Sequence, residues 1–268
     1  VVMDKNYWDG VAGDAVNGEL TAPVPGLPQA EPSMKVSYSQ PKDFNGLLTY
    51  VRNILIVDID PNIYTKVSLS AEEDRWASGQ LVLTLKAPSP EMVAEYTQQH
   101  PNQLTNLFVK EEMARATRQL EKTYSSVVMD VLKKNHQVAL NVPEEMVYYK
   151  DTTNFFWATN NASAGRMDVV VYTFPYTDPN TFTADYLVAM REANLPGAFP
   201  GSYMATETKY FDVDYSPIEV EGKYCGVMRG LWKMVGDMMG GPFVSHARLD
   251  EKNQRVVVAE GFVYAPET

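Results

Sequence analysis

The chain has few of the residues that build metal and redox sites. Its 268 residues include one cysteine, Cys225, and three histidines. A single cysteine excludes an intrachain disulfide and any zinc site made of paired thiolates. The histidines, His100, His136 and His246, are never four residues apart, so they do not form the helical pair that binds a metal. We therefore expect no metal site and no cofactor.

Basic residues are also scarce. The chain has 23 lysines and arginines against 34 acidic residues, which gives a formal net charge of −11. Lys133 and Lys134 are its one adjacent basic pair. Nucleic acid and anionic lipid both require a basic surface, so neither is expected as a partner.

Long apolar runs are missing as well. No run approaches the ~20 apolar residues that a membrane-spanning helix needs. The first ten residues also lack the basic and then apolar pattern of a signal peptide. Val1 and Val2 have the character of the middle of a strand, so we interpret the sequence as one trimmed at its start.

What the chain does have is the composition of a globular protein, with 45% hydrophobic and 21% charged residues. The apolar run 53–59 and the alternating run 80–87 predict two strands, and Ser89 caps a predicted helix that ends near Gln99. Residues 102–141 contain neither glycine nor proline. Apolar residues recur there every three to four positions, which predicts a long amphipathic helix that ends near Asn135.

The second half is dominated by patterns typical of strands, including a predicted hairpin of 243–249 with 255–264. We predict one α+β domain over residues 1–268, with mixed, largely antiparallel sheets covered by helices. Two loosely similar lobes, 1–100 and 140–268, would be joined by the long helix at about 102–135. The similarity rests on a repeated strand, strand, helix order in each lobe.

No motif for catalysis is apparent. The chain has no serine in a nucleophile elbow, and the glycines of 236–241 lack the lysine of a phosphate-binding loop, so we interpret them as a turn or bulge. Neighbouring strands could bring Cys225 to His246, with Asp237 to orient the histidine. A cysteine in an apolar strand is more typical of a core residue, and paired acids are more typical of solvated strand ends. We therefore assign no catalytic residue.

Binding is suggested by the segment 229–248, where two apolar, β-prone runs flank a flexible Gly-Gly-Pro joint. Exposed aromatic side chains beside arginine are typical of sites for sugars, peptides and partner proteins. The hypothesis requires Trp232 or Trp157 to stand exposed in a groove; the alternative is that the aromatics pack in the core. The candidate binding residues are Arg229, Trp232, Asp237, Trp157 and Tyr203.

Several long motifs also carry a resemblance to a known family. They are VPGLPQAEP (24–32), RNILIVDIDP (52–61), FFWATNNA (155–162), LPGAFPGSYMAT (195–206), RGLWKMVGDMMGGPFVSHARLD (229–250) and the following VVVAEGFVYAPE. Over essentially its whole length the chain resembles a Bacteroidetes family, number 4837 among the domains of unknown function. The resemblance implies a predicted lipoprotein of the cell envelope, with its signal peptide removed and a lipid-carrying cysteine near the mature N-terminus. Neither feature occurs in this sequence, and the family supplies no activity or catalytic residues.

Three functions remain open. The leading hypothesis is a non-enzymatic, lipid-anchored envelope protein that binds a partner protein or a glycan and meets the membrane through its implied anchor alone. The first alternative is an envelope hydrolase that uses carboxylates or Cys225 and His246. The second is a structural or oligomerisation scaffold with an exposed apolar stripe on Leu120, Tyr124 and Val127. Ligand identity, oligomeric state and strand order are left open by the sequence.

Overall fold

The computed structural model describes residues 1–197 and 199–266, and its chain divides into two compact units. Unit 1 consists of Val1–Val24 and Ala30–Gln119, and unit 2 consists of Pro25–Gln29 and Leu120–Thr268. Each unit has its own sheet and its own hydrophobic core. The predicted α+β class is confirmed.

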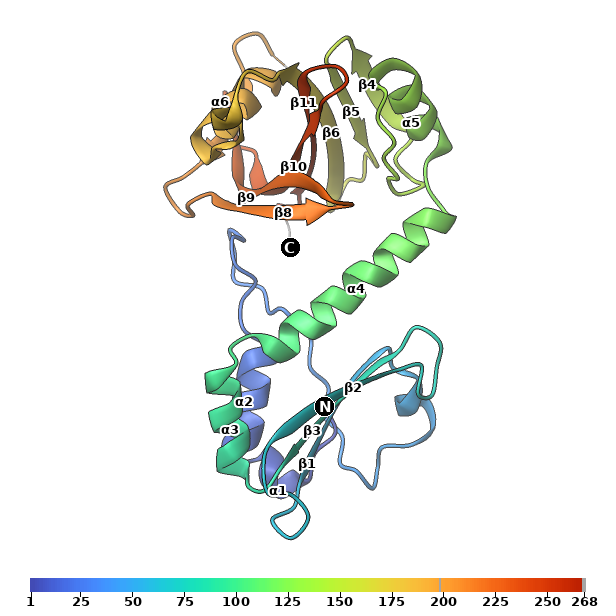
Figure 1. Cartoon of the computed structure of the whole chain (residues 1–268), viewed down its shortest axis with the longest axis vertical. Helices are drawn as coiled ribbons and strands as arrows, with labels where there is room; N and C mark the ends of the chain where they lie inside the picture. The colour runs from blue at the N-terminus through green and yellow to red at the C-terminus, as the bar shows by residue number, and fades with distance from the viewer. Residues whose placement is uncertain (198, 267–268) are drawn as a thin grey trace. The chain divides into compact units, whose positions relative to one another are not determined.

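Unit 1 is built on a three-stranded mixed sheet in the order β1-β3-β2 (Figure 1). β1 (Asn53–Ile59) and β3 (Leu81–Ala87), both predicted as strands, run parallel to each other. β2 (Ser68–Glu73) pairs antiparallel with β3. The open edge of β1 is met by Val2, which forms an isolated parallel bridge with Ile56. The N-terminal residues therefore belong to this sheet.

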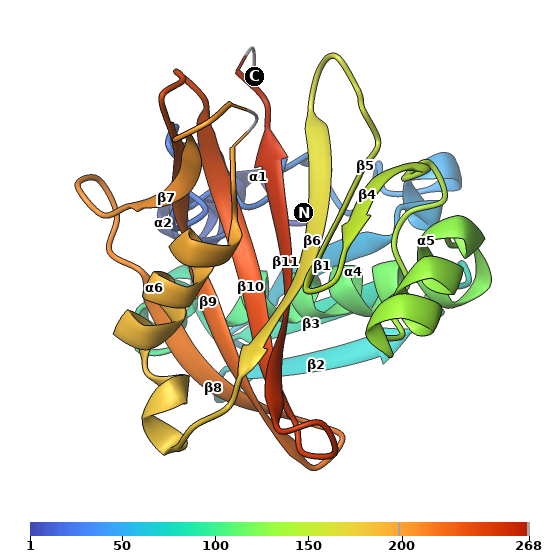
Figure 2. The same cartoon turned by 90° about the horizontal axis from the view of Figure 1, so that it is seen from above.

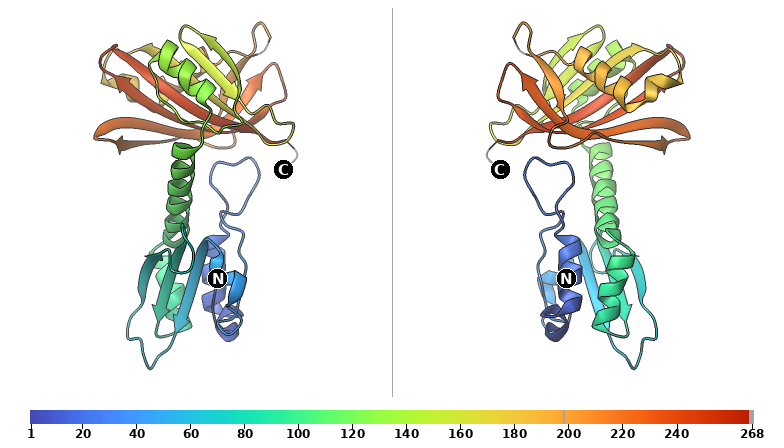
Figure 3. Two further views of the ribbon diagram at one scale, coloured as in Figure 1. Left: turned by 90° about the vertical axis from the view of Figure 1, so that its right-hand side faces the viewer. Right: turned by 90° about the vertical axis from the view of Figure 1, so that its left-hand side faces the viewer.

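Helices cover one face of this sheet. α2 (Val11–Leu20) and α3 (Pro90–Gln99) pack side by side (Figure 3), and the short α1 (Lys5–Trp8) precedes them. α3 begins as predicted, because the Ser89 side chain accepts a hydrogen bond from the backbone of Met92. The 3-10 helix η1 (Gly46–Tyr50) leads into β1. The core on the helical side includes Val16, Leu20, Leu55, Leu83, Val93, Leu104 and Phe108.

The long helix predicted over 102–135 is interrupted. α4 (Gln103–Lys122) ends before a short break, and α5 (Ser126–Val131) then continues into a π-helical turn, η2 (Leu132–His136). The break is made by Ser125, whose hydroxyl accepts a hydrogen bond from the Val128 amide at 3.4 Å and donates to the Met146 carbonyl at 2.8 Å. A serine that caps a new helix in this way stops the preceding one.

Unit 2 is built on an eight-stranded antiparallel sheet in the order β4-β5-β6-β11-β10-β9-β7, with β8 also paired to β9. The strands form a curved surface (Figure 2). The predicted hairpin of 243–249 with 255–264 is confirmed by the pairing of β10 with β11. The strands are β4 (Tyr148–Thr152), β5 (Phe155–Thr159), β6 (Arg166–Pro175), β7 (Tyr203–Glu207), β8 (Asp214–Val220), β9 (Lys223–Val235), β10 (Gly240–Asp250) and β11 (Arg255–Tyr264).

Different helices cover the two faces of the larger sheet. On the α6 face, Val170 and Tyr172 pack with Leu187 of α6 (Ala184–Asn194), which follows the 3-10 turn η3 (Pro179–Phe182). On the α5 face, Phe156 packs with residues of α5 and η2. Alternation along each strand decides which side chains lie on which face.

The repeated strand, strand, helix order does not correspond to one repeated topology. β1 and β3 are parallel, whereas β5 and β6 form an antiparallel hairpin. The physical reason is the connection: the segment from β1 to β3 is long enough to contain β2, while a short loop joins β5 to β6. A short loop allows only antiparallel neighbours.

Candidate binding site

A cavity of about 360 Å³ lies in unit 2 against the α6 face of the sheet. Strand residues form its floor, and the segment from α6 to β7 and the β9–β10 turn form its sides. Trp157, Trp232 and Asp237, three of the five candidate binding residues, line it. Trp157 lies far from Trp232 and Asp237 in the chain, and the sheet brings the two segments together.

Trp157 forms part of the floor and is held by hydrogen bonds. It is half-buried, and its indole Nε1 donates to Asp168 Oδ1 at 3.0 Å. Arg166 Nε donates to the other oxygen of the same carboxylate at 2.9 Å. The Asp168 side chain is fully buried. Because one carboxylate binds both groups, the Trp157 ring has a defined orientation toward the cavity.

Trp232 forms a wall of the cavity and is 1% exposed. Its Nε1 donates to the Val263 carbonyl at 3.3 Å, and its ring packs edge-on against Phe262 with the centroids 5.4 Å apart. The neighbouring Gly241 makes this possible: a Cβ there would lie 2.1 Å from the Val263 oxygen and 3.1 Å from Trp232 Nε1. The glycine is thus required for close backbone packing.

Methionines and one exposed phenylalanine supply further apolar surface. Met204, Met234 and Met239 line the cavity, and a flexible thioether adapts to ligands of different shape. Phe199 is 67% exposed and also lines it. The turn that carries Phe199 is closed by Ser202 Oγ, which donates to the Phe199 carbonyl at 2.6 Å. Sequence patterns did not identify these residues.

Three charged side chains lie among these apolar ones. They are Lys150, Arg166 and Asp237. Asp237 is exposed and its Oδ1 accepts a hydrogen bond from the Met238 amide at 2.7 Å. It is the one carboxylate among the described lining residues of this cavity, whereas most glycoside hydrolases use a pair of carboxylates. The arrangement is suited to binding an apolar group beside a polar one.

The two remaining candidate residues, Arg229 and Tyr203, lie on the other face of the sheet. Arg229 is separated from Trp232 by three positions of one strand, and an odd separation places side chains on opposite faces. Arg229 Nη1 is instead 3.8 Å from Asp214 Oδ2. Tyr203 pairs with Val235, six positions from Arg229, and so shares its face. The alternation of side chains along β9 is therefore enough to separate Arg229 from the site.

Cys225 and His246 do come together. Their Sγ and Nδ1 atoms are 3.8 Å apart, with Cys225 fully buried. Burial raises the pKa of the Cys225 thiol against the opposing effect of Arg248. Burial, together with the charges of Arg229 and Arg248, lowers the pKa of His246. A neutral thiol beside a neutral imidazole is not an activated nucleophile.

Asp237, the third member of the hypothetical triad, does not join that pair. It lies in the turn between β9 and β10, whereas Cys225 pairs with Arg248 toward the far end of the same two strands. Within residues 1–197 and 199–266, moreover, no three or more His, Cys, Asp and Glu side chains group as a metal site would require.

The apolar stripe of the scaffold hypothesis does not lie on one helix. Leu120 is on α4, Tyr124 is in the break, and Val127 is on α5. As for membranes, none of the helices in the described part of the chain combines the length and apolar character that crossing a bilayer requires.

Comparison with known families divides the chain in two. Residues 125–268 match the sequence model of a domain of unknown function, DUF4837, and residues 1–121 match a second domain of unknown function, DUF8532. The expected resemblance to family 4837 over essentially the whole chain is thereby corrected, because the motifs at 24–32 and 52–61 fall in the DUF8532 part. No curated protein and no solved structure matches the chain.

Proposed function

Because the chain belongs to the DUF4837 family, a domain of unknown function matched over residues 125–268, we propose a function from the site itself: the protein is a non-enzymatic binding protein. The cavity of unit 2 is its ligand site. The observation that carries the proposal is Trp157, a half-buried indole fixed by Asp168 on the floor of a cavity rich in methionine and aromatic side chains. Such cavities with a few polar groups are the usual form of binding sites.

The ligand is an apolar or aromatic side chain of a partner protein. A sugar would need several polar groups in the cavity to receive its hydroxyls, and the Asp168 carboxylate is already used by Trp157 and Arg166. The thioethers and rings of Met204, Met239 and Phe199 instead favour an apolar occupant. Lys150 and Asp237 then supply polar contacts beside the apolar occupant. A glycan is the alternative ligand.

We infer a cell-envelope location, with the protein anchored as a lipoprotein in a member of the Bacteroidetes. This part of the proposal rests on the resemblance of the sequence motifs to predicted lipoproteins. Metabolic labelling of the native bacterium with an alkyne-tagged fatty acid tests it. The protein should carry the label, and an unlabelled protein in the soluble fraction would reject this location.

The ligand class is tested by probing a peptide microarray and a glycan microarray with the fluorescently labelled chain. We expect binding to peptides with aromatic, leucine or methionine residues. Met239→Ser removes an apolar side chain from the cavity and should weaken that binding at least roughly tenfold. Met238→Ser is the matched control, because Met238 is 99% exposed and does not line the cavity.

Three outcomes would reject the proposal. Binding to glycans that Met239→Ser weakens and Met238→Ser does not would replace the partner protein by a carbohydrate. Binding that responds equally to both substitutions, or no binding on either array, would show that the cavity is not the ligand site.

A further inference from the structure

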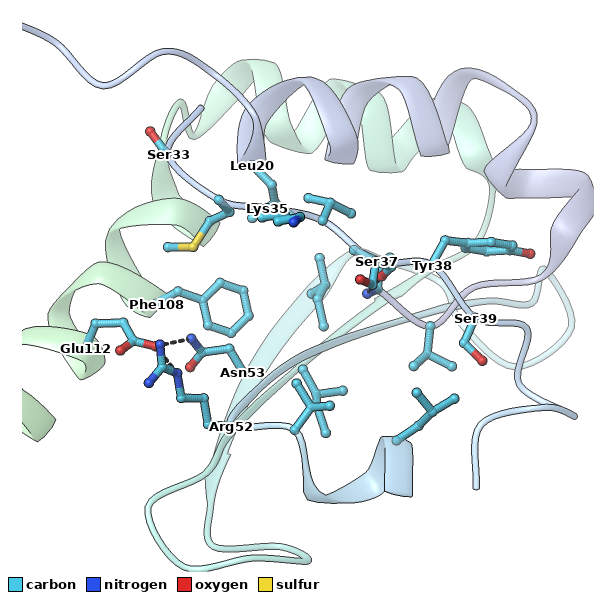
Figure 4. A pocket seen from close by; sticks show the side chains of 18 of the residues that line it. Leu20, Ser33, Lys35, Ser37, Tyr38, Ser39, Arg52, Asn53, Phe108 and Glu112 are labelled. Carbon is cyan, nitrogen blue, oxygen red and sulfur yellow. Dashed lines mark hydrogen bonds and ion pairs between the residues drawn. The ribbon is translucent and has the colours of Figure 1, made fainter. Parts of the chain in front are cut away.

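A slot the width of one strand lies at the open edge of β1, within unit 1. Val2 occupies one end of it, and bridges in parallel both to Ile56 of β1 and to Ser39 on the opposite side. Beyond Val1 the slot continues as a cavity of about 600 Å³ between residues 33–37 and 52–55 (Figure 4). The same two walls that hold Val2 therefore extend past it.

The β1 wall presents backbone hydrogen-bonding groups to the cavity. Arg52 accepts from the Leu81 amide of β3, so even-numbered residues of β1 face β3. Odd-numbered residues face the slot: the Leu55 carbonyl accepts from the Val2 amide at 2.8 Å, and the Val57 amide donates to the Val2 carbonyl at 2.9 Å. By the same alternation, the amides of Asn53 and Leu55 point toward the cavity. An open strand edge of this kind is a template for another strand.

The opposite wall, formed by residues 37–39, also presents backbone hydrogen-bonding groups to the slot. The Ser39 amide donates to the Val1 carbonyl at 2.9 Å, and the Val1 amino group donates to the Ser37 carbonyl at 2.7 Å. A strand placed further along the slot would thus find partners on both sides. Val2 bridges to Ser39 and Ile56. The residue directly ahead of Val1 is two positions before Val2, so its partners would be Ser37 and Ile54.

Apolar side chains lie above and below the slot. Leu20 and Phe108 belong to the core on the helical side of the sheet (Figure 4). Phe44 packs with Ile54 on the other side. Val51 also lines the cavity and is 48% exposed. The slot therefore has apolar walls as well as free backbone groups along its edges.

We propose that this slot binds a strand of polypeptide joined to Val1, which runs parallel to β1 and continues the line of Val1–Met3. Since both faces are apolar, the strand carries β-branched apolar residues at successive positions, as buried parallel strands do. The Val1 amino group donates to the Ser37 carbonyl at 2.7 Å. A joined strand replaces that amine with a peptide N–H, which makes the same bond to Ser37.

The test compares three forms of the full chain: the chain from Val1, the same chain preceded by Val-Ile-Val-Ile, and the chain preceded by Gly-Ser-Gly-Ser. Hydrogen exchange is measured at the Asn53 and Leu55 amides, and thermal unfolding is followed in parallel. The apolar extension should slow exchange at both amides roughly tenfold or more and raise the melting temperature of unit 1 by about 5 °C. The glycine-serine extension should do neither.

Equal exchange in the two extended chains would overturn the proposal. A second result would also overturn it: the free Val-Ile-Val-Ile peptide protects these amides, but the same sequence joined to Val1 does not. The occupant of the slot would then be a separate chain. The cavity of unit 2 is not involved, so either result is independent of the microarray experiment.

Discussion

Arg191 and Glu260 form a fully buried, two-point ion pair between α6 and β11. Both side chains are 0% exposed, with Arg191 Nε 2.9 Å from Glu260 Oε2 and Nη2 2.7 Å from Oε1. The guanidinium also lies over the Phe243 ring at 4.0 Å. Its Nη2 is 2.9 Å from the sulfur of Met204, which lines the candidate site. The pair thus links the helix, the sheet and the cavity.

Replacing one member of this pair should destabilise unit 2 strongly. Arg191→Met leaves the Glu260 carboxylate buried without its partner, and we expect the free energy of unfolding to fall by about 3–5 kcal/mol. The double variant Arg191→Met, Glu260→Leu removes both charges and should recover most of that loss. Urea unfolding followed by circular dichroism measures all three proteins. A double variant no more stable than the single one would contradict this account.

The acid sensitivity of unit 2 should depend on Asp151. Its Oδ1 lies 2.6 Å from His136 Nε2, and its Oδ2 accepts from Asn135. Burial raises the pKa of Asp151, but the bonds from His136 and Asn135 outweigh it, and the pKa lies below its usual 3.8. The folded state therefore binds fewer protons than the unfolded state. The stabilisation is present above pH 3.8 and is lost as the pH falls through the folded pKa.

Asp151→Asn should therefore lower the free energy of unfolding at pH 7 by about 1–3 kcal/mol and make its decline between about pH 5 and pH 3 shallower. Denaturant titrations at several pH values measure both effects. Asp130→Asn is the control, because Asp130 is an exposed aspartate of α5. If the control changes the slope as much as Asp151→Asn does, the effect reflects net charge rather than this contact.

The thiol of Cys225 should be unreactive in the folded protein. It is fully buried, and burial raises its pKa, so little thiolate forms near pH 7. Alkylation by iodoacetamide should be more than about 100-fold slower than in 6 M guanidinium chloride. His246→Ala should leave this rate unchanged. Fast labelling at pH 7 that His246→Ala abolishes would instead support the hydrolase alternative.

The break between α4 and α5 should be sensitive to one hydroxyl group. Ser125→Ala removes the acceptor for the Val128 amide and the donor to the Met146 carbonyl, and should cost about 1–2 kcal/mol. Ser126→Ala is the matched control, since Ser126 is exposed and lies one residue inside the helix. Comparable losses in the two variants would argue against the capping role of Ser125.

Local patterns predicted the elements more accurately than their boundaries. The Ser89 cap and the alternation in β10 and β11 correctly gave a helix and a hairpin. The uninterrupted helix over 102–135 was wrong, although the absence of glycine and proline favoured it. Its end is set by Ser125, which bonds to Met146, a residue 21 positions away. Periodicity in a short window contains no information on that contact.

The candidate site divides in the same way between local pattern and tertiary structure. The sequence by itself determined which side chains share a strand face, and the period of two is enough to separate Arg229 from Trp232. Only the tertiary structure decided that Trp157 of β5 and Trp232 of β9 line one cavity, with Lys150 of β4 beside them. The physical reason is that strand order and sheet curvature depend on how whole faces pack against α6 and α5, which is a property of distant contacts.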